Sequence, residues 1–212
     1  GEMQNLAKGV GDLKRVLTNV KSRGILGEYQ LQAILENLLS PDQYVLNVLV
    51  GSGSRERVEF AVKMPGQQEE ILLPIDSKFP QESYLRLVDA YEVANKHAID
   101  SSRQELLKAV RKAAADIQNK YINPPYTTDF AILFLPVESL YAEILREPGF
   151  SQEIQVNYKV IVTGPTTLSA ILNSLQMGFR TLAIQKRSSE VWQILGAVKT
   201  EFGKFGMPIE RT

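Results

Sequence analysis

An apolar run ends in two opposite charges in the segment Ile71-Leu72-Leu73-Pro74-Ile75-Asp76-Ser77-Lys78. Apolar residues at both odd and even positions predict a strand that is buried on both faces, in the middle of a sheet. Residues two apart on a strand point to the same face, so we expect Asp76 and Lys78 to lie side by side. A buried carboxylate is costly unless it is paired or binds a ligand. Metal-dependent phosphodiester chemistry is one function that uses such a pair.

Two more strands are predicted upstream, at residues 44–50 and 57–63. The second is joined to the apolar strand by residues 65–68, Pro-Gly-Gln-Gln, which suit a hairpin connection. Its alternating pattern places Glu59 on the face opposite to its larger apolar side chains. If the two strands pair antiparallel, the carboxylates of Glu59 and Asp76 lie near each other on one face.

A further acid faces inward on a helix predicted at residues 24–39. The apolar face of this helix includes Leu31, Leu35 and Leu39, and Glu28 precedes them by 3, 7 and 11 residues. Inward acids are usually paired, so a buried ion pair is the structural alternative to a functional role. Glu28 is therefore a candidate site residue together with Glu59 and Asp76.

Helices and short strands alternate through the rest of the chain. Helices are predicted at 5–20, 80–95, 99–121, from 138 onward, 164–184 and 188–205, and strands at 130–135 and 159–162. A small mixed sheet flanked by helices belongs to the α/β class, here with helical extensions at both ends. The expected domains are an N-terminal helix at 1–22, an α/β domain at 23–187 and a C-terminal helix at 188–212.

Composition narrows the possible chemistry. The 212 residues contain 24 Lys and Arg against 24 Asp and Glu, so a nucleic-acid partner must be met by a local basic patch. Lys108, Arg111 and Lys112 form such a cluster on one helix, although a solvated helix face is the simpler interpretation. No cysteine is present, which excludes disulfides, thiolate metal sites and cysteine nucleophiles. Oxygen ligands and hard cations are what is left for metal chemistry.

Four residues together suit a metal-dependent nuclease site. Glu59 and Asp76 would hold a divalent cation such as Mg²⁺ or Mn²⁺, because Mg²⁺ prefers a few carboxylates plus waters and phosphate oxygens. Lys78 would orient or help deprotonate the attacking water, and Glu28 would complete the metal shell, position a second ion or steer the water. The structural alternatives are a solvent-facing Glu59, a helix-capping Asp76 and a strand-end Lys78 whose stem packs on apolar surface.

Five separated motifs follow one another across residues 24–205. They are Gly27-Glu28-Tyr29-Gln30-Leu31, Pro74-Ile75-Asp76-Ser77-Lys78, Lys120-Tyr121, Phe134-Leu135-Pro136-Val137-Glu138 and Gly164-Pro165-Thr166-Thr167-Leu168. In this order they resemble the RmuC family of bacterial DNA recombination proteins. The resemblance implies a PD-(D/E)xK core, that is, a restriction-endonuclease-like mixed sheet flanked by helices. It also implies an Mg²⁺-dependent endodeoxyribonuclease and a role in limiting recombination at short inverted repeats.

The family's site residues fall on named positions of this chain. Its helix acid corresponds to Glu28, and its Asp-x-Lys corresponds to Asp76 and Lys78. Where the family usually shows Arg-Pro-Asp, this chain has Arg57-Val58-Glu59, whose longer acid shifts the carboxylate oxygens by about 1.5 Å. Glu138 and Thr166-Thr167 also match family motifs, with no role assigned: they are an acid following a strand and a helix N-terminus able to meet phosphate.

The resemblance also bears on location and partners. Family members usually carry an N-terminal membrane anchor and then a coiled coil, and residues 1–22 resemble the end of that coil. Neither a signal-peptide pattern nor an apolar stretch of membrane-spanning length occurs in the sequence. The expected location is the bacterial cytoplasm, tethered to the membrane in a full-length protein, with DNA as partner and self-association through terminal helices. Two alternatives to a nuclease are a catalytically inactive DNA-binding or scaffolding domain and a purely structural oligomerisation domain.

Overall fold

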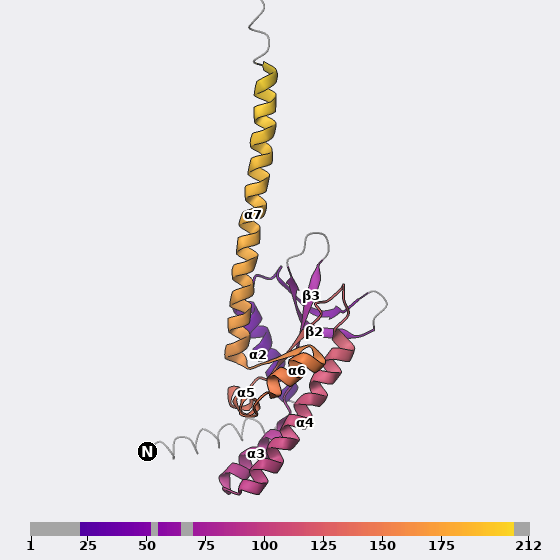
Figure 1. Cartoon of the computed structure of the whole chain (residues 1–212), viewed down its shortest axis with the longest axis vertical. Helices are drawn as coiled ribbons and strands as arrows, with labels where there is room; N and C mark the ends of the chain where they lie inside the picture. Colours follow the sequence, from indigo (N-terminus) through magenta and orange to yellow (C-terminus); the bar gives the residue numbers. More distant parts are fainter. Residues whose placement is uncertain (1–21, 52–54, 65–69, 206–212) are drawn as a thin grey trace, which may run out of the picture. The chain divides into compact units, whose positions relative to one another are not determined.

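The computed structural model of the chain describes residues 22–51, 55–64 and 70–205 (Figure 1). Three predicted features lie outside the described residues. They are the helix at 5–20, residues 1–21 of the N-terminal segment, and the hairpin connection at 65–68. In chain order the described elements are α2 (Ser22–Leu38), β1 (Tyr44–Leu49), β2 (Arg57–Met64), β3 (Ile71–Ser77), α3 (Gln81–Glu92), α4 (Lys96–Tyr121), β4 (Ala131–Phe134), α5 (Glu138–Leu145), α6 (Phe150–Tyr158), β5 (Val160–Thr163) and α7 (Pro165–Phe205).

A mixed sheet lies at the centre of the described fold. Its five strands, counted over the described residues, are ordered β1-β2-β3-β4-β5. The neighbours from β1 to β3 are antiparallel, and those from β3 to β5 are parallel. β3 is the middle strand, as its apolar run predicts, and residues 72–76 are buried. The mixed sheet with flanking helices confirms the predicted α/β class and is compatible with a nuclease-like fold.

The register of β2 against β3 determines which side chains meet at the end of the hairpin. Phe60 lies opposite Ile75 in the antiparallel ladder. Glu59 and Asp76 are the next residues along the two strands, one step beyond this last pair. Residues directly opposite each other in an antiparallel pair project from the same face with their side chains close together. The antiparallel pairing on which the predicted proximity of Glu59 and Asp76 depends is therefore confirmed.

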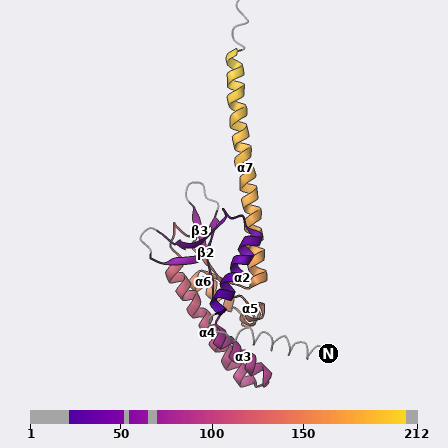
Figure 2. The same ribbon diagram turned by 180° about the vertical axis from the view of Figure 1, so that it is seen from behind.

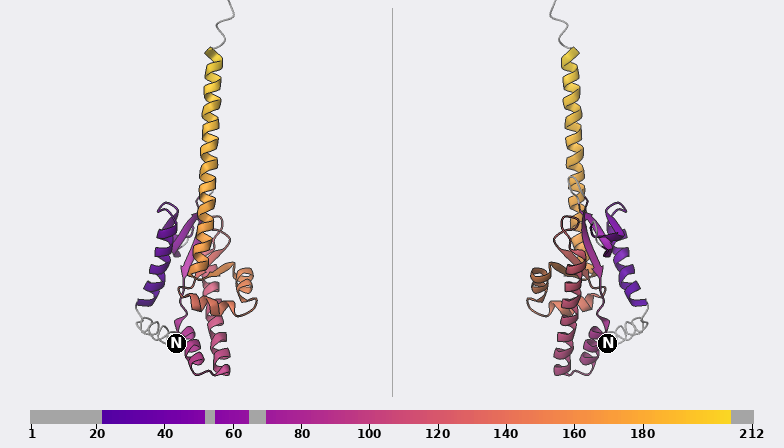
Figure 3. Two further views of the ribbon diagram at one scale, coloured as in Figure 1. Left: turned by 90° about the vertical axis from the view of Figure 1, so that its left-hand side faces the viewer. Right: turned by 90° about the vertical axis from the view of Figure 1, so that its right-hand side faces the viewer.

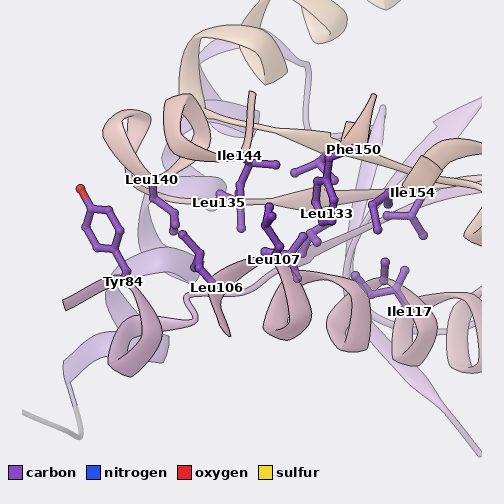
Figure 4. Packing of buried hydrophobic residues seen from close by; sticks show 14 of the residues in the cluster. Tyr84, Leu106, Leu107, Ile117, Leu133, Leu135, Leu140, Ile144, Phe150 and Ile154 are labelled. Carbon is purple, nitrogen blue, oxygen red and sulfur yellow. The ribbon is translucent and has the colours of Figure 1, made fainter. Parts of the chain in front are cut away.

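Helices cover the sheet on both sides. The larger described core cluster joins α3, α4, α5 and α6 to alternate residues of β4 and β5, and Figure 4 shows Leu106 and Leu107 of α4 packed near Leu133 and Leu135. Figure 3 shows α2 on the other side of the sheet from α4, and α2 contacts β3. The centre of the sheet is thus excluded from water on both faces, and polar side chains at the end of β3 lie at the margin of this core.

The last described helix is longer than predicted. Two helices were expected at 164–184 and 188–205, but α7 continues unbroken from Pro165 to Phe205 (Figure 2). The two-helix prediction is wrong because Gln185-Lys186-Arg187 contains neither Gly nor Pro to end a helix. Contacts divide the chain into a unit ending at Leu172 and another beginning at Asn173. None of the described helices has the length and apolar character needed to cross a membrane.

Candidate active site

Asp76 and Lys78 form an ion pair at the end of β3. The Asp76 side chain is 1% exposed, whereas that of Lys78 is 47% exposed. Lys78 Nζ donates a hydrogen bond to Asp76 Oδ1 at 3.2 Å and lies 2.9 Å from Oδ2. The Lys78 amide donates to the carbonyl of Phe134 at 3.0 Å, which holds the end of β3 against β4. The expected side-by-side placement of Asp76 and Lys78 is present.

Both oxygens of the buried Asp76 carboxylate lie next to the Lys78 ammonium. Burial raises the pKa of Asp76 above its ordinary value of 3.8, and the charge and hydrogen bond of Lys78 only partly offset this effect. Oδ2 is buried and is paired with the Lys78 ammonium at 2.9 Å. An ionised carboxylate has about four lone-pair sites, and one ammonium occupies only part of them. Asp76 is therefore suited to binding a cation through Oδ2.

The carboxylates of Glu59 and Glu28 add negative charge near Asp76. Glu59 is an exposed residue overall, yet partial burial of its carboxyl raises its pKa above 4.5. The charges of Glu28 and Asp76 raise that pKa further, and the charge of Lys78 lowers it. Three carboxylates and one ammonium thus interact electrostatically at one end of the sheet. The four residues predicted from the sequence thus lie within electrostatic range of one another.

A close approach of α2 to the sheet positions Glu28. Leu31 and Leu35 are fully buried, and Glu28 is half-buried on the same helical face. One residue earlier, Gly27 lies so near the end of β3 that a methyl group there would be 2.7 Å from Ser77 Oγ. It would also be 3.3 Å from Cγ of Pro136. The missing side chain of Gly27 allows α2 to bring Glu28 to the carboxylates.

We expect Gly27→Ala to destabilise the protein by about 1–3 kcal/mol, because the new methyl group must push α2 or Ser77 aside. The matched control is Gly178→Ala, since a methyl group at Gly178 meets nothing within 4 Å. In that open helical position alanine should stabilise by about 0.5–1 kcal/mol. Denaturant unfolding measures both changes. Equal effects at the two glycines would contradict the close approach, and adding Ser77→Gly should restore part of the loss in Gly27→Ala.

Two residues at the end of α4 belong to this site but were given no role from the sequence. Lys120 lowers the pKa of Asp76 through its charge. Burial, together with the charges of Asp76, Glu59 and Glu56, raises the pKa of Tyr121 to about 12. The Tyr121 hydroxyl therefore keeps its proton at neutral pH and is a donor beside acidic groups. Their only signal in the sequence was the Lys120-Tyr121 motif, which does not indicate how near α4 ends to β3.

Glu138 contacts the start of α7. Its Oε2 accepts a hydrogen bond from the Thr166 amide at 3.2 Å, at the start of α7. A carboxylate is favourable at a helix N-terminus because it satisfies a free amide and the helix dipole. The first turn of α7 therefore already has an anionic partner from the chain itself, at the position where the sequence suggested a phosphate.

The predicted basic cluster on α4 divides into two kinds of residue. Arg111 makes two hydrogen bonds to the Glu153 carboxylate, at 2.7 and 3.0 Å, and its guanidinium lies 4.8 Å from the centre of the Phe150 ring. These contacts fasten α4 to α6 and occupy the guanidinium. Lys108 and Lys112 are exposed on the same helix. Contact of these two lysines with DNA stays a prediction.

The donor set at the end of β3 fits a hydrated divalent cation. Within the described residues, no group of three or more acidic or histidine side chains is arranged to hold a metal ion. Mg²⁺ commonly uses only one or two carboxylates, with waters and substrate phosphate oxygens as its other ligands. Glu59 and Asp76, which follow the last paired residues of β2 and β3 and interact electrostatically, offer two such carboxylates. Glu28 would then act through a water molecule.

Comparisons with known proteins agree on one family. The model of the RmuC family matches residues 1–212. A DNA recombination protein RmuC homolog of Xylella fastidiosa is 55% identical over 214 residues, which cover 100% of this chain and 47% of that protein. Homologs of the same name from Chlamydia pneumoniae and Pseudomonas aeruginosa are 29% and 24% identical, each over 94% of this chain and 48% and 44% of their own length. The chain thus spans about half the length of these relatives. No solved structure gives a significant match.

Proposed function

The chain belongs to the RmuC family, and we propose that it is the domain of a DNA recombination protein that hydrolyses DNA phosphodiester bonds with Mg²⁺ or Mn²⁺. The observation that carries the proposal is the buried Asp76 carboxylate at the end of β3, which is paired with Lys78 and interacts electrostatically with Glu59. The family resemblance extends the proposed role to limiting recombination at inverted repeats.

Each residue of the site has a task in this reaction. Glu59 and Asp76 would hold the cation, which would polarise the phosphate and lower the pKa of a bound water molecule. Lys78 has a half-exposed side chain, so its ammonium can reach a phosphate oxygen while its proximity to Asp76 keeps it oriented. Its positive charge stabilises the negative charge that develops on the phosphorane. Glu28 accepts a proton from, or orients, the water that attacks.

Metal binding without DNA provides a test that does not depend on turnover. Titration of the protein with Mn²⁺, followed by electron paramagnetic resonance, should give a site that Asp76→Asn and Glu59→Gln each weaken at least about tenfold. The control is Glu70→Gln, since Glu70 is an exposed acid paired with Lys63 at 3.1 Å. Cleavage of hairpin, branched and single-stranded DNA is then measured for the same proteins. Mn²⁺ affinity that neither site substitution changes would overturn the proposed site.

The second candidate is a DNA-binding or scaffolding domain without catalysis. The lack of a three-ligand cluster among the described residues favours it, because Asp76 is then simply the ion-pair partner of Lys78. This candidate predicts salt-sensitive DNA binding that is unchanged by Asp76→Asn. It also predicts no metal-dependent cleavage of any DNA structure. Turnover that requires Mn²⁺ and disappears in Asp76→Asn would exclude it.

A further inference from the structure

A pocket opens directly beside the candidate active site. It has a volume of about 240 Å³ and lies between the end of β3, the middle of α4 and strand β4. Its lining includes Phe79, Pro80, Ala109, Ala113, Leu133 and Leu135. Lys78 also lines it, so the same ammonium that contacts Asp76 stands at the pocket. Lys78 is therefore shared by the pocket and the candidate active site.

Small side chains on α4 create the pocket. Ala109 and Ala113 are one helical turn apart, and each presents only a methyl group to the pocket where a larger side chain would fill it. Leu133 and Leu135 of the β4 region are fully buried and belong to the core. The pocket thus has apolar walls set into the core.

The charges beside this apolar space are mainly positive. Lys78 and Lys112 both line the pocket, together with one acid, Asp116. Lys112 is exposed and has no ion pair within the described parts of the chain. An apolar cavity with ammonium groups beside it is complementary to a flat, weakly polar ring that is joined to a phosphate.

We propose that this pocket binds one unstacked nucleobase of the strand whose phosphate contacts Lys78, so that the substrate is single-stranded or locally unpaired DNA. The inference rests on the proposed function and names its substrate class. The volume is below the roughly 300–1,000 Å³ of pockets for drug-sized ligands, which suits a single ring system. A base in an intact duplex would first have to leave its stack and its partner, whereas an unpaired base enters without that cost.

The test compares single-stranded and duplex DNA in binding assays without metal. Fluorescence anisotropy with EDTA present gives the affinity of the whole chain for a labelled single strand and for the same sequence as a duplex. Ala113→Leu fills the pocket and should weaken binding of the single strand about tenfold while leaving duplex binding unchanged. The control is Ala115→Leu on the same helix, since Ala115 does not line the pocket. Thermal melting checks that both variants fold.

The charge contribution is tested by a matched pair of lysines. Lys112→Gln should weaken single-strand binding several-fold. It should also reduce the slope of log affinity against log salt concentration by the amount expected for about one phosphate contact. Lys108→Gln removes an equally exposed charge one turn away, outside the pocket, and should have a smaller effect. If Ala113→Leu does not fold, a single strand carrying 2-aminopurine replaces it. The wild-type protein should then shield that base from acrylamide quenching, and a base that stays fully accessible overturns the proposal.

The outcomes separate this inference from the proposed function. Equal losses in Ala113→Leu and Ala115→Leu, or equal losses for single strand and duplex, overturn the pocket. If Ala113→Leu binds single strands like wild type while Asp76→Asn abolishes cleavage, the pocket is wrong and the nuclease stands. If Ala113→Leu selectively loses single-strand binding while Asp76→Asn still cleaves, the metal site is wrong and the pocket stands.

Discussion

Asp76→Asn is expected to lower Mg²⁺-dependent DNA cleavage about 10³-fold, the upper range for losing a group that stabilises charge in a transition state. Asparagine keeps the shape of the side chain but replaces the buried anionic oxygen Oδ2 by a neutral atom. A cation placed between Asp76 and Glu59 would lose one of its two carboxylate ligands. Single-turnover cleavage of a hairpin substrate measures the effect on the chemical step. The control is Asp42→Asn, which removes an exposed acid outside the site.

Asp76→Asn should also be more stable than the metal-free wild type, by about 1 kcal/mol at pH 7. Burial raises the pKa of Asp76 in the folded state, so ionisation above the unfolded value of 3.8 disfavours folding. This destabilisation is absent well below pH 3.8, grows between pH 3.8 and the higher folded pKa, and is constant above the folded pKa. The difference in melting temperature between Asp76→Asn and wild type should therefore be small near pH 4 and larger at pH 7. A difference that does not depend on pH would contradict this account.

Lys78→Ala is expected to lower cleavage about 10²-fold while Mn²⁺ affinity is kept. The ammonium is not a metal ligand in this site, and its removal takes away the cation nearest to the Asp76 carboxylate. Lys78 lowers the pKa of Asp76, so the variant should need a higher pH to reach its maximal metal binding. Cleavage rates and Mn²⁺ titrations over a pH series give both quantities.

Two further variants show whether charge or position matters at Lys78. Lys63→Ala removes a lysine from the neighbouring strand β2, where it pairs with the exposed Glu70, and should cleave like wild type. Lys78→Arg keeps the charge and should recover part of the lost activity. An activity loss in Lys63→Ala as large as in Lys78→Ala would mean that general surface charge, and not this ammonium, is responsible.

The main parts of the site could be predicted because each has a local signal. The apolar positions of β3 predict burial on both faces, and the spacing of Asp76 and Lys78 places both on one face. Glu28 is on the apolar face of its helix by periodicity alone. The hairpin order of β2 and β3 then predicts that Glu59 approaches Asp76. In each case the relevant distance along the chain is short or the partner is set by one strand pairing.

Other parts depend on contacts between segments that are far apart in sequence. The Lys120-Tyr121 motif carries no sign that α4 ends beside the carboxylates, because that depends on how α4 crosses the sheet. The sequence does not distinguish Arg111 from any exposed helical cation. Its structural role follows from its contacts with Glu153 and Phe150 of α6. Glu138 meets the start of α7 only because β4 and β5 are parallel neighbours.

The sequence by itself determined the α/β class, the central apolar strand and the four charged residues at one end of the sheet. Periodicity indicates which face of a helix or strand is buried. Strand pairing then determines which side chains on that face lie close together. Only the tertiary structure decided that Gly27 lets α2 approach Ser77 and that the Asp76 carboxylate is desolvated beside Lys78. It alone placed an apolar pocket beside Lys78. The reason is physical: a close approach, a desolvated atom and a cavity are each defined by surfaces from several elements, and no local pattern encodes how those surfaces meet.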